Sequence, residues 1–406
     1  RDTNGWCPFC ERTWLFLRLT ETAYSEKLIN LRDKPEYYLK LVPTTLVPAI
    51  QFDVQTSRDA EMIEALTTDP TFKNVTKILN RRNPVARFLL RKKRVVMWES
   101  TQTMQVIDRF LSPQSKARLF LPDTPTKIRA EELVANVSKA GFSLNYPRGF
   151  GNSTSAPSTT AEERRSNFDA ALTALDAHLT SSGGPFLLGS LPTVTDVSIV
   201  PTLERLRYQL PITQSYTVYD DSRYPGIARW FDAMSSLEAY EGRVAGDEVS
   251  WLSTIPVFAR MFAGPEGMSK ENEEKAARAE VRVEALLAEL EGKDLNSVGS
   301  KYREEAAAKV LGNRKAIIAD ISNQDAKSQK HIPRLSPASN PAVSEMLDAA
   351  VDALLLADLG RPAQAVADEN LGAAREAAKI MAQRLCAPRD MSAPAARALR
   401  IALLSI

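Results

Sequence analysis

The sequence predicts an α/β N-terminal domain, then an all-α domain, then a further α-helical extension. Three observations predict this order. A Cys-Pro-Phe-Cys motif at residues 7–10 opens a helix, strand-like and helical segments alternate up to about residue 110, and later apolar residues recur mostly with helical spacing. The expected domains are residues 1–110, 111–263 and 264–406, and a basic helical insertion is expected at 53–93.

The motif places a thiol at the start of a helix. Pro8 suits the first helical position, where a missing N–H costs nothing. A helix N-terminus favours an anion, so Cys7 should lose its proton readily, and the thiolate is the nucleophile. Cys10 lies one turn further on, where it can attack a mixed disulfide formed on Cys7. The motif therefore indicates thiol-transfer or redox chemistry.

Two buried structural cysteines, or half of a zinc site, are the alternative interpretations. Cys386 is the only other cysteine, and His178 and His331 are the only histidines. Four zinc ligands are therefore hard to supply, and we expect no metal.

The segments after this helix predict the rest of the α/β domain. Residues 23–31 and 44–50 are read as strands, with a short helix at 32–40 between them. Residues 94–98 are read as another strand, and the Glu-Ser pair at 99–100 is a capping signal for the next helix.

Four segments, in their order along the chain, carry a resemblance: CPFCER, LRDKPEYYLKLVPTTLVPAI, WES and GPFLLGSLPTVTDVSIVP. They resemble cysteine-type glutathione transferases, closest to the omega class and its dehydroascorbate-reductase and lambda relatives. The resemblance covers about residues 1–52 and 94–245. It implies a thioredoxin-like domain that binds glutathione and an all-α transferase domain that supplies the acceptor pocket. Glutathione and a small electrophile or disulfide would be the substrates.

The resemblance also implies roles for the matching residues. Cys7 would form a mixed disulfide with glutathione, with its thiolate held by Arg12 or by the helix dipole, and Cys10 is the candidate resolving thiol. The candidate contacts to glutathione are Phe9, Lys34, Val47, Pro48, Glu99 and Ser100. The candidates for the acceptor pocket are Trp98, Met104, Phe142 and Tyr146.

Each contact would serve one part of glutathione. Phe9 would lie against the tripeptide, and Lys34 would reach one of its carboxylates. Val47 would offer its backbone N–H and C=O, followed by Pro48 in cis. Of the pair at 99–100, the carboxylate would bind the γ-glutamyl ammonium, while the hydroxyl and the helix N-terminus would bind its carboxylate.

Two segments depart from the family pattern. The insertion at 53–93 includes a basic stretch, residues 71–94, in which Lys and Arg recur without any acid. It suits an acidic protein partner, an anionic membrane surface, or simply a solvated flap over the sheet edge. The tail predicts helices at 269–291, 301–322, 343–357, 370–385 and 393–404.

Residues 384–397 of this tail are similar to a C-terminal module of transferase-like proteins of photosynthetic algae. Its apolar helix faces suggest a packing or docking module. We expect deletion of 264–406 to leave a soluble core that binds glutathione.

Composition sets further limits. The formal net charge is +2, so the basic stretch is a local feature, and we expect no nucleic-acid partner. No apolar run approaches the roughly 18 residues of a membrane span, although peripheral association with a membrane or membrane complex is left open, as is a dimer. Three cysteines, two of them in the motif, suit a reducing compartment.

The family has a strand before the motif, and residues 1–6 are too short and polar to form it. We therefore expect a truncated chain, which suits a processed plastid (chloroplast) protein; the cytoplasm is the alternative. Two functions stay open: a glutathione-dependent thiol transferase or reductase, and a transferase-fold accessory subunit whose insertion and tail contact a larger assembly.

Overall fold

The structure is a computed structural model of the 406-residue chain. It describes residues 7–30, 34–54, 58–73, 76–80, 93–112, 118–146, 159–261, 267–322 and 334–406. The chain divides into two compact units, one with residues 2–135 and 177–202 and the other with residues 136–176 and 203–406.

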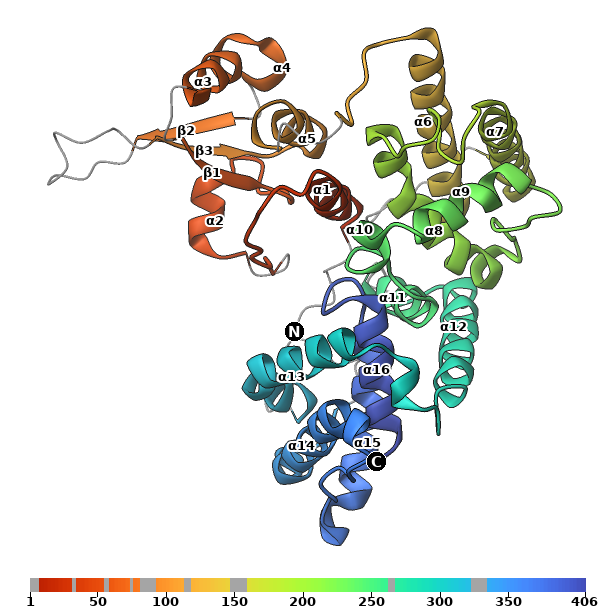
Figure 1. Cartoon of the computed structure of the whole chain (residues 1–406). Coiled ribbons are helices and arrows are strands. Elements are labelled where there is room, and N and C mark those ends of the chain that lie inside the picture. Colours follow the sequence, from red (N-terminus) through yellow and green to blue (C-terminus); the bar gives the residue numbers. More distant parts are fainter. Residues whose placement is uncertain are drawn as a thin grey trace, which may run out of the picture. The chain divides into compact units, whose positions relative to one another are not determined.

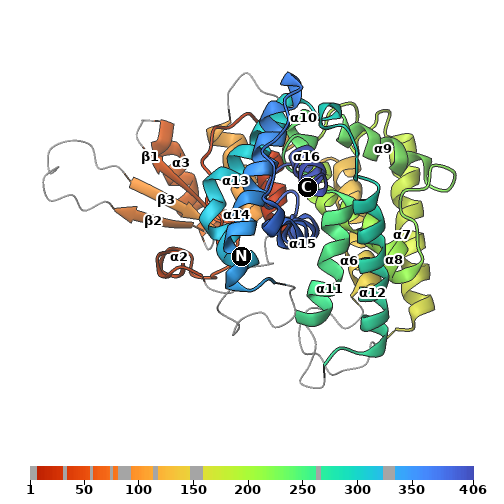
Figure 2. The ribbon, with the colours of Figure 1, turned by 90° about the horizontal axis from the view of Figure 1, so that it is seen from below.

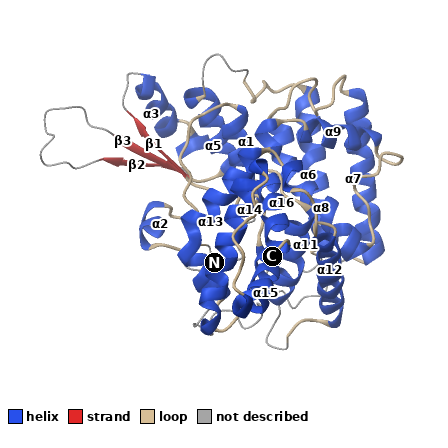
Figure 3. Cartoon of the chain, turned by 60° about the horizontal axis from the view of Figure 1, so that its bottom comes forward, coloured by secondary structure: helices blue, strands red, loops and turns tan. Residues whose placement is uncertain are grey.

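The described strands are β1 (Ile50–Val54), β2 (Thr76–Asn80) and β3 (Lys93–Met97), shown in red in Figure 3. The helices up to residue 146 are α1 (Pro8–Leu19), α2 (Glu36–Leu41), α3 (Arg58–Thr68), α4 (Pro70–Lys73), α5 (Ser100–Val106), the π-helical turn η1 (Ile107–Leu111) and α6 (Pro125–Asn145). The next helices are α7 (Ala161–Ser181), α8 (Val194–Gln214), α9 (Pro225–Ser235), α10 (Glu238–Glu241) and α11 (Glu248–Met261). The tail holds α12 (Lys270–Ala288), α13 (Ser300–Ile321), α14 (Asn340–Leu356), α15 (Asp368–Arg384) and α16 (Ala393–Leu404), with 3-10 turns at Leu295–Ser297, Pro337–Ser339 and Ala357–Leu359.

The sheet of the first unit has the order β1-β3-β2, and β3 is antiparallel to both neighbours. Successive side chains of a strand point to opposite faces. Val95 and Met97 therefore pack with α3 and α4, whereas Val96 and Trp98 pack with α2. Figure 1 shows α2 on one side of the sheet and α3 and α4 on the other.

Several predicted elements of this unit are confirmed. The strand expected at 94–98 is β3, and the helix expected at 32–40 is α2, which begins only at Glu36. The capping pair at 99–100 does precede a helix, since α5 begins at Ser100.

Two predicted strands are wrong. Residues 23–30 have no regular structure, and the strand expected at 44–50 begins only at Ile50. An alternating pattern becomes a strand only where a neighbouring strand completes its hydrogen-bond ladder. Among the described residues, β1 and β2 pair with β3, and no strand pairs with 23–30. Thr45 has a positive φ of 56°, which interrupts extended backbone before β1.

The insertion at 53–93 is not purely helical. It holds α3, α4 and the strand β2, which forms the far edge of the sheet. Residues 81–92, the centre of the predicted basic stretch, lie outside the described residues.

The helices predicted for the tail are present, and α16 has the predicted bounds. On α7, Phe168 and Leu172 lie four residues apart and are fully buried. Figures 1 and 2 show α13 to α16 side by side. None of the described helices is both long and apolar enough to cross a lipid bilayer.

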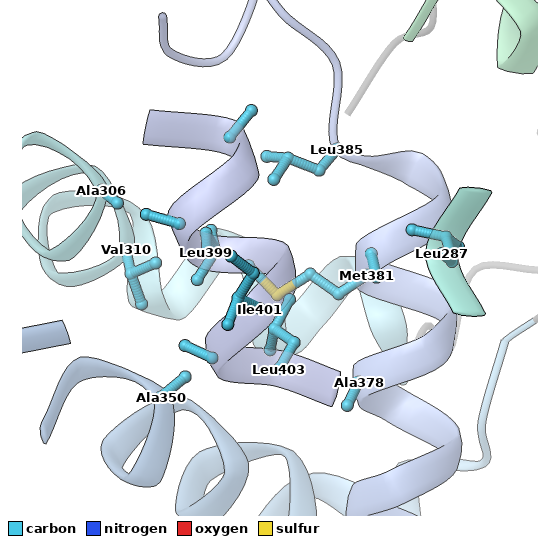
Figure 4. Close-up of a cluster of buried hydrophobic side chains, with 14 of the residues drawn as sticks. Leu287, Ala306, Val310, Ala350, Ala378, Met381, Leu385, Leu399, Ile401 and Leu403 are labelled. Atoms are coloured by element: carbon cyan, nitrogen blue, oxygen red, sulfur yellow. The ribbon is translucent and has the colours of Figure 1, made fainter. Parts of the chain in front are cut away.

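One apolar core joins α11 to the helices of the tail, from α12 to α16. Val249 and Leu252 of α11 belong to the same buried cluster as Leu287 of α12 and Leu399 and Leu403 of α16. Figure 4 shows α16 inside this cluster, with apolar side chains of the surrounding helices directed at it. The predicted boundary at 263/264 therefore does not separate two cores.

This shared core corrects two expectations about the tail. Most of the apolar residues of α14, α15 and α16 pack against one another in the cluster that also holds residues of α11, so this part of each face is core and is not free for docking. Deletion of 264–406 would expose Val249, Leu252 and Ile255, so we no longer expect a soluble remainder.

Candidate functional site

Cys7 is the residue that caps the N-terminus of α1. Its backbone is extended, with φ −89° and ψ 113°, and Pro8 is the first helical residue. The N–H groups of Cys10 and Glu11 donate to the Cys7 carbonyl at 3.0 and 3.1 Å. Leu15 and Phe16 anchor the other end of the helix in the core. The sequence thus places Cys7 at the N-terminus of a helix whose other end is anchored in the core.

The surroundings of Cys7 favour its thiolate. The pKa of Cys7 is lowered, most strongly by a hydrogen bond from the Cys10 side chain and also by the backbone N–H groups of Cys10 and Phe9. Burial and the nearby Glu11 carboxylate raise the pKa and only partly offset this effect. The guanidinium of Arg12, the other group expected to hold the thiolate, lies over the Phe9 ring, 5.1 Å from its centre.

Val47 is the next residue that the structure brings to the sulfur. When Cys7 is protonated, its Sγ donates to the Val47 carbonyl at 3.7 Å. The peptide bond between Val47 and Pro48 is cis, as expected. Because β1 begins only at Ile50, the Val47 backbone lies outside the sheet ladder, where an extended peptide thiol can pair with it.

The Glu99-Ser100 pair lies at the start of α5. Glu99 is exposed and has a positive φ of 138°, a strained conformation for a residue with a side chain, whereas Ser100 is buried. Trp98, just before the pair, packs in the same cluster as Val47. The pair therefore directly follows a residue of the cluster against which Val47 packs.

The other candidates are less closely connected. Phe9 is 49% exposed beside Cys7, so its ring is open to a ligand. Lys34 is half-buried just before Pro35, and the described residues show no hydrogen bond or ion pair between it and Cys7. Of the acceptor-pocket candidates, Trp98 and Met104 are buried core residues, and Phe142 and Tyr146 belong to the other unit.

Tyr38 is a site residue that sequence reasoning missed. It is buried on α2, and the thiolate charges of Cys10 and Cys7 contribute, after burial, to raising its pKa. Tyr38 and Val42 are four residues apart and share one helix face, and this spacing is the signal that could have separated Tyr38 from the exposed Tyr37.

Replacing Cys10 should change the titration of Cys7. Cys10→Ala removes the largest contribution that lowers the Cys7 pKa, so the rate of Cys7 alkylation should reach its plateau at a higher pH than in the wild type. Cys10→Ser keeps a hydroxyl donor and is the matched control, with a midpoint closer to the wild type. Iodoacetamide labelling followed by mass spectrometry measures this, and identical profiles for all three proteins would contradict the assigned contact.

Comparison with known proteins connects this geometry to a family. Residues 6–109 match the family model described as "Glutathione S-transferase, N-terminal domain", and residues 158–233 match "Glutathione S-transferase, C-terminal domain". The chain therefore has the thioredoxin-like and the helical domain of glutathione S-transferases, followed by extra C-terminal helices, as the sequence predicts.

Curated relatives are also glutathione S-transferases. The chloroplastic DHAR3 of Arabidopsis thaliana is 36% identical over 59 residues, which are 14% of this chain and only 23% of that protein. DHAR2 of Arabidopsis thaliana is 22% identical over 257 residues, 63% of this chain and 92% of that protein.

A solved structure is similar as well. The dehydroascorbate reductase of Chlamydomonas reinhardtii overlaps with 58% of this chain and 83% of its own, at 15% identity and a TM-score of 0.38. This overlap is too loose for a comparison of single residues.

Proposed function

We propose that this protein is a glutathione-dependent thiol transferase or reductase that uses the Cys7 thiolate as its nucleophile. The single observation that carries the proposal is the environment of Cys7, whose pKa is lowered at the N-terminus of α1, in contact with Cys10 and Val47. Both relatives above are named glutathione S-transferases, which supports glutathione as the thiol substrate.

The reaction follows from thiol–disulfide exchange. The Cys7 thiolate attacks one sulfur of a substrate disulfide, forms a mixed disulfide with it and releases the other sulfur as a thiolate, which takes up a proton. When the substrate is a mixed disulfide of glutathione, Cys7 attacks the glutathione sulfur, so that glutathione stays bound to Cys7 through a disulfide. A second glutathione thiolate then attacks that glutathione sulfur, forms glutathione disulfide and releases the Cys7 thiolate. Alternatively Cys10, whose side chain contacts the Cys7 sulfur, attacks that sulfur, releases the thiol bound to it and forms a disulfide with Cys7, which two molecules of glutathione then reduce.

The remaining residues of the site suit a tripeptide with charged ends. Val47 offers a backbone outside the sheet, and Phe9 offers an exposed ring. Pro48 follows Val47 in the same turn. We assign the γ-glutamyl end to Glu99 and to Ser100 at the start of α5, and we retain Lys34 as the contact to a carboxylate.

The direct test uses the whole 406-residue chain. Calorimetry should show that it binds glutathione, and with glutathione it should reduce a small mixed disulfide faster than glutathione alone. After alkylation of Cys7, binding at the Glu99-Ser100 end should persist while catalysis is lost. Absence of both binding and turnover in the unmodified protein would overturn the proposal.

The double variant Glu99→Ala with Ser100→Ala should bind glutathione roughly tenfold to a few hundredfold more weakly, because two hydrogen bonds to charged groups are lost. Calorimetry measures the dissociation constant. Thr101→Ala, at an exposed position in the same turn, is the matched control and should leave the constant unchanged. An unchanged constant in the double variant removes this pair from the site.

The alternative function, an accessory subunit of a larger assembly, has less support in the structure. It depended on leftover apolar surface of the tail, and much of that apolar surface is buried in the core shared with α11. The basic stretch lies mostly outside the described residues, so its acidic or membrane partner stays a prediction, as does a plastid location.

A further inference from the structure

Tyr38 is buried in the apolar cluster next to Val47, the backbone neighbour of the Cys7 sulfur. It is 6% exposed, and its ring packs with Val42, Val96 and Trp98 in the cluster that Val47 also joins. A buried ring fixed by α2 and the sheet can hold its hydroxyl in one place.

This hydroxyl binds the turn that leads into the thiol site. It donates to the Leu46 carbonyl at 2.5 Å, and Leu46 directly precedes Val47. The Leu46 side chain is 59% exposed, so its packing does little to anchor the turn, and Thr45 before it has a positive φ. The hydroxyl thus ties a strained, exposed turn to the core at the residue before Val47.

The hydroxyl acts on the backbone rather than as an acid or base. The pKa of Tyr38 is raised, first by burial and then by the thiolate charges of Cys10 and Cys7. It therefore stays protonated wherever Cys7 is ionised, and its proton is directed at the Leu46 carbonyl.

We propose that Tyr38 is a positioning residue of the thiol site: by binding the Leu46 carbonyl it fixes the Val47 backbone beside the Cys7 sulfur, in the place where glutathione pairs with it. This inference rests on the proposed function for the identity of the ligand. The hydrogen bond from Tyr38 to Leu46, which we call the tether, does not depend on the identity of the ligand.

The test is Tyr38→Phe, which keeps the packed ring and removes only the donor. The KM for glutathione should rise about three- to tenfold, the range expected for one neutral hydrogen bond. The kcat and the alkylation rate of Cys7 should change less than about twofold, because the sulfur keeps its contacts with Cys10 and the helix start. Tyr37→Phe, whose hydroxyl belongs to an exposed ring beneath Lys27, is the matched control and should match the wild type.

A second measurement needs no glutathione. Hydrogen exchange of the amides of residues 44–47 should be faster in Tyr38→Phe than in the wild type and in Tyr37→Phe. Unchanged exchange overturns the tether. An unchanged KM, or a fall in kcat and alkylation rate as large as the rise in KM, overturns the positioning role.

These outcomes are distinct from failure of the proposed function. If the wild-type protein does not bind glutathione, the proposed ligand is wrong, and the exchange experiment still decides whether Tyr38 holds the turn. If glutathione binds and Cys7 reacts, but Tyr38→Phe matches Tyr37→Phe in both measurements, only the inference about Tyr38 is overturned.

Discussion

Cys7→Ser is expected to lower glutathione-dependent disulfide reduction by on the order of a thousandfold or more, since loss of a nucleophile removes the covalent route. A serine hydroxyl stays protonated at this helix start, whereas the Cys7 thiol has a lowered pKa. The fold should be unaffected, because serine is nearly isosteric with cysteine and Cys7 is only half-buried. Steady-state turnover of a small mixed disulfide, with a thermal melt of the same sample, measures both effects.

Cys10→Ser is the matched control for this experiment. It should preserve the turnover of substrates whose reduction uses the Cys7 thiol alone. It should slow only reactions that need a disulfide between Cys7 and Cys10. Retained turnover in Cys7→Ser would remove Cys7 from the mechanism. If Cys10→Ser loses as much turnover with a substrate that needs only Cys7 as with one that needs both cysteines, Cys10 has a role other than resolving a disulfide.

Arg400→Met is expected to destabilise the second unit by about 3 kcal/mol, the low end of the cost of breaking a buried ion pair. Arg400 on α16 is 1% exposed and bonds to the Asp247 carboxylate at 2.6 Å, the Ser250 hydroxyl at 3.2 Å and the Leu385 carbonyl at 2.7 Å. The Asp247 side chain keeps some exposure to water, which limits the loss. The apparent Tm should fall by about 6–12 °C for a unit of this size.

Arg397→Met, at an exposed position one turn earlier on α16, should leave the melting temperature unchanged. Equal melting of both variants would show that the ion pair with Asp247 does not hold α16 to α11. Deletion of 264–406 should have the larger effect, giving an aggregating product, because it removes Arg400 together with the apolar cover of α11.

The sequence predicts helices well where apolar spacing is sustained. The bounds of α16 agree with the prediction, and Phe168 and Leu172, four residues apart on α7, are both buried. The pattern at 23–31 fails because alternation reports which face is apolar and not whether a neighbouring strand exists. Partners of this kind come from distant parts of the chain, as the pairing of β1 with β3 shows.

The sequence located the thiol and its closest backbone neighbour, but it did not reveal the residues that support them. The cysteine pair and Val47 do meet, and local spacing sufficed to find the thiol. The donors to the sulfur and the bond from Tyr38 to Leu46 depend on how α1, α2 and the turn before β1 approach one another. The packing of α11 with the far end of the tail was also not predicted. Part of the cluster around Val249 and Leu252 comes from α16, over a hundred positions away in the sequence.

The position of α16 inside the core affects how the protein is made. Translation proceeds at roughly 5–20 residues per second, so α16 leaves the ribosome several seconds to about half a minute after α11. During that interval the core of the second unit lacks the side chains of α16, which packs with α13, α14 and α15. The second unit must therefore complete its folding late in synthesis, and a nascent chain stalled before residue 393 leaves apolar side chains of this core exposed to chaperones and proteases.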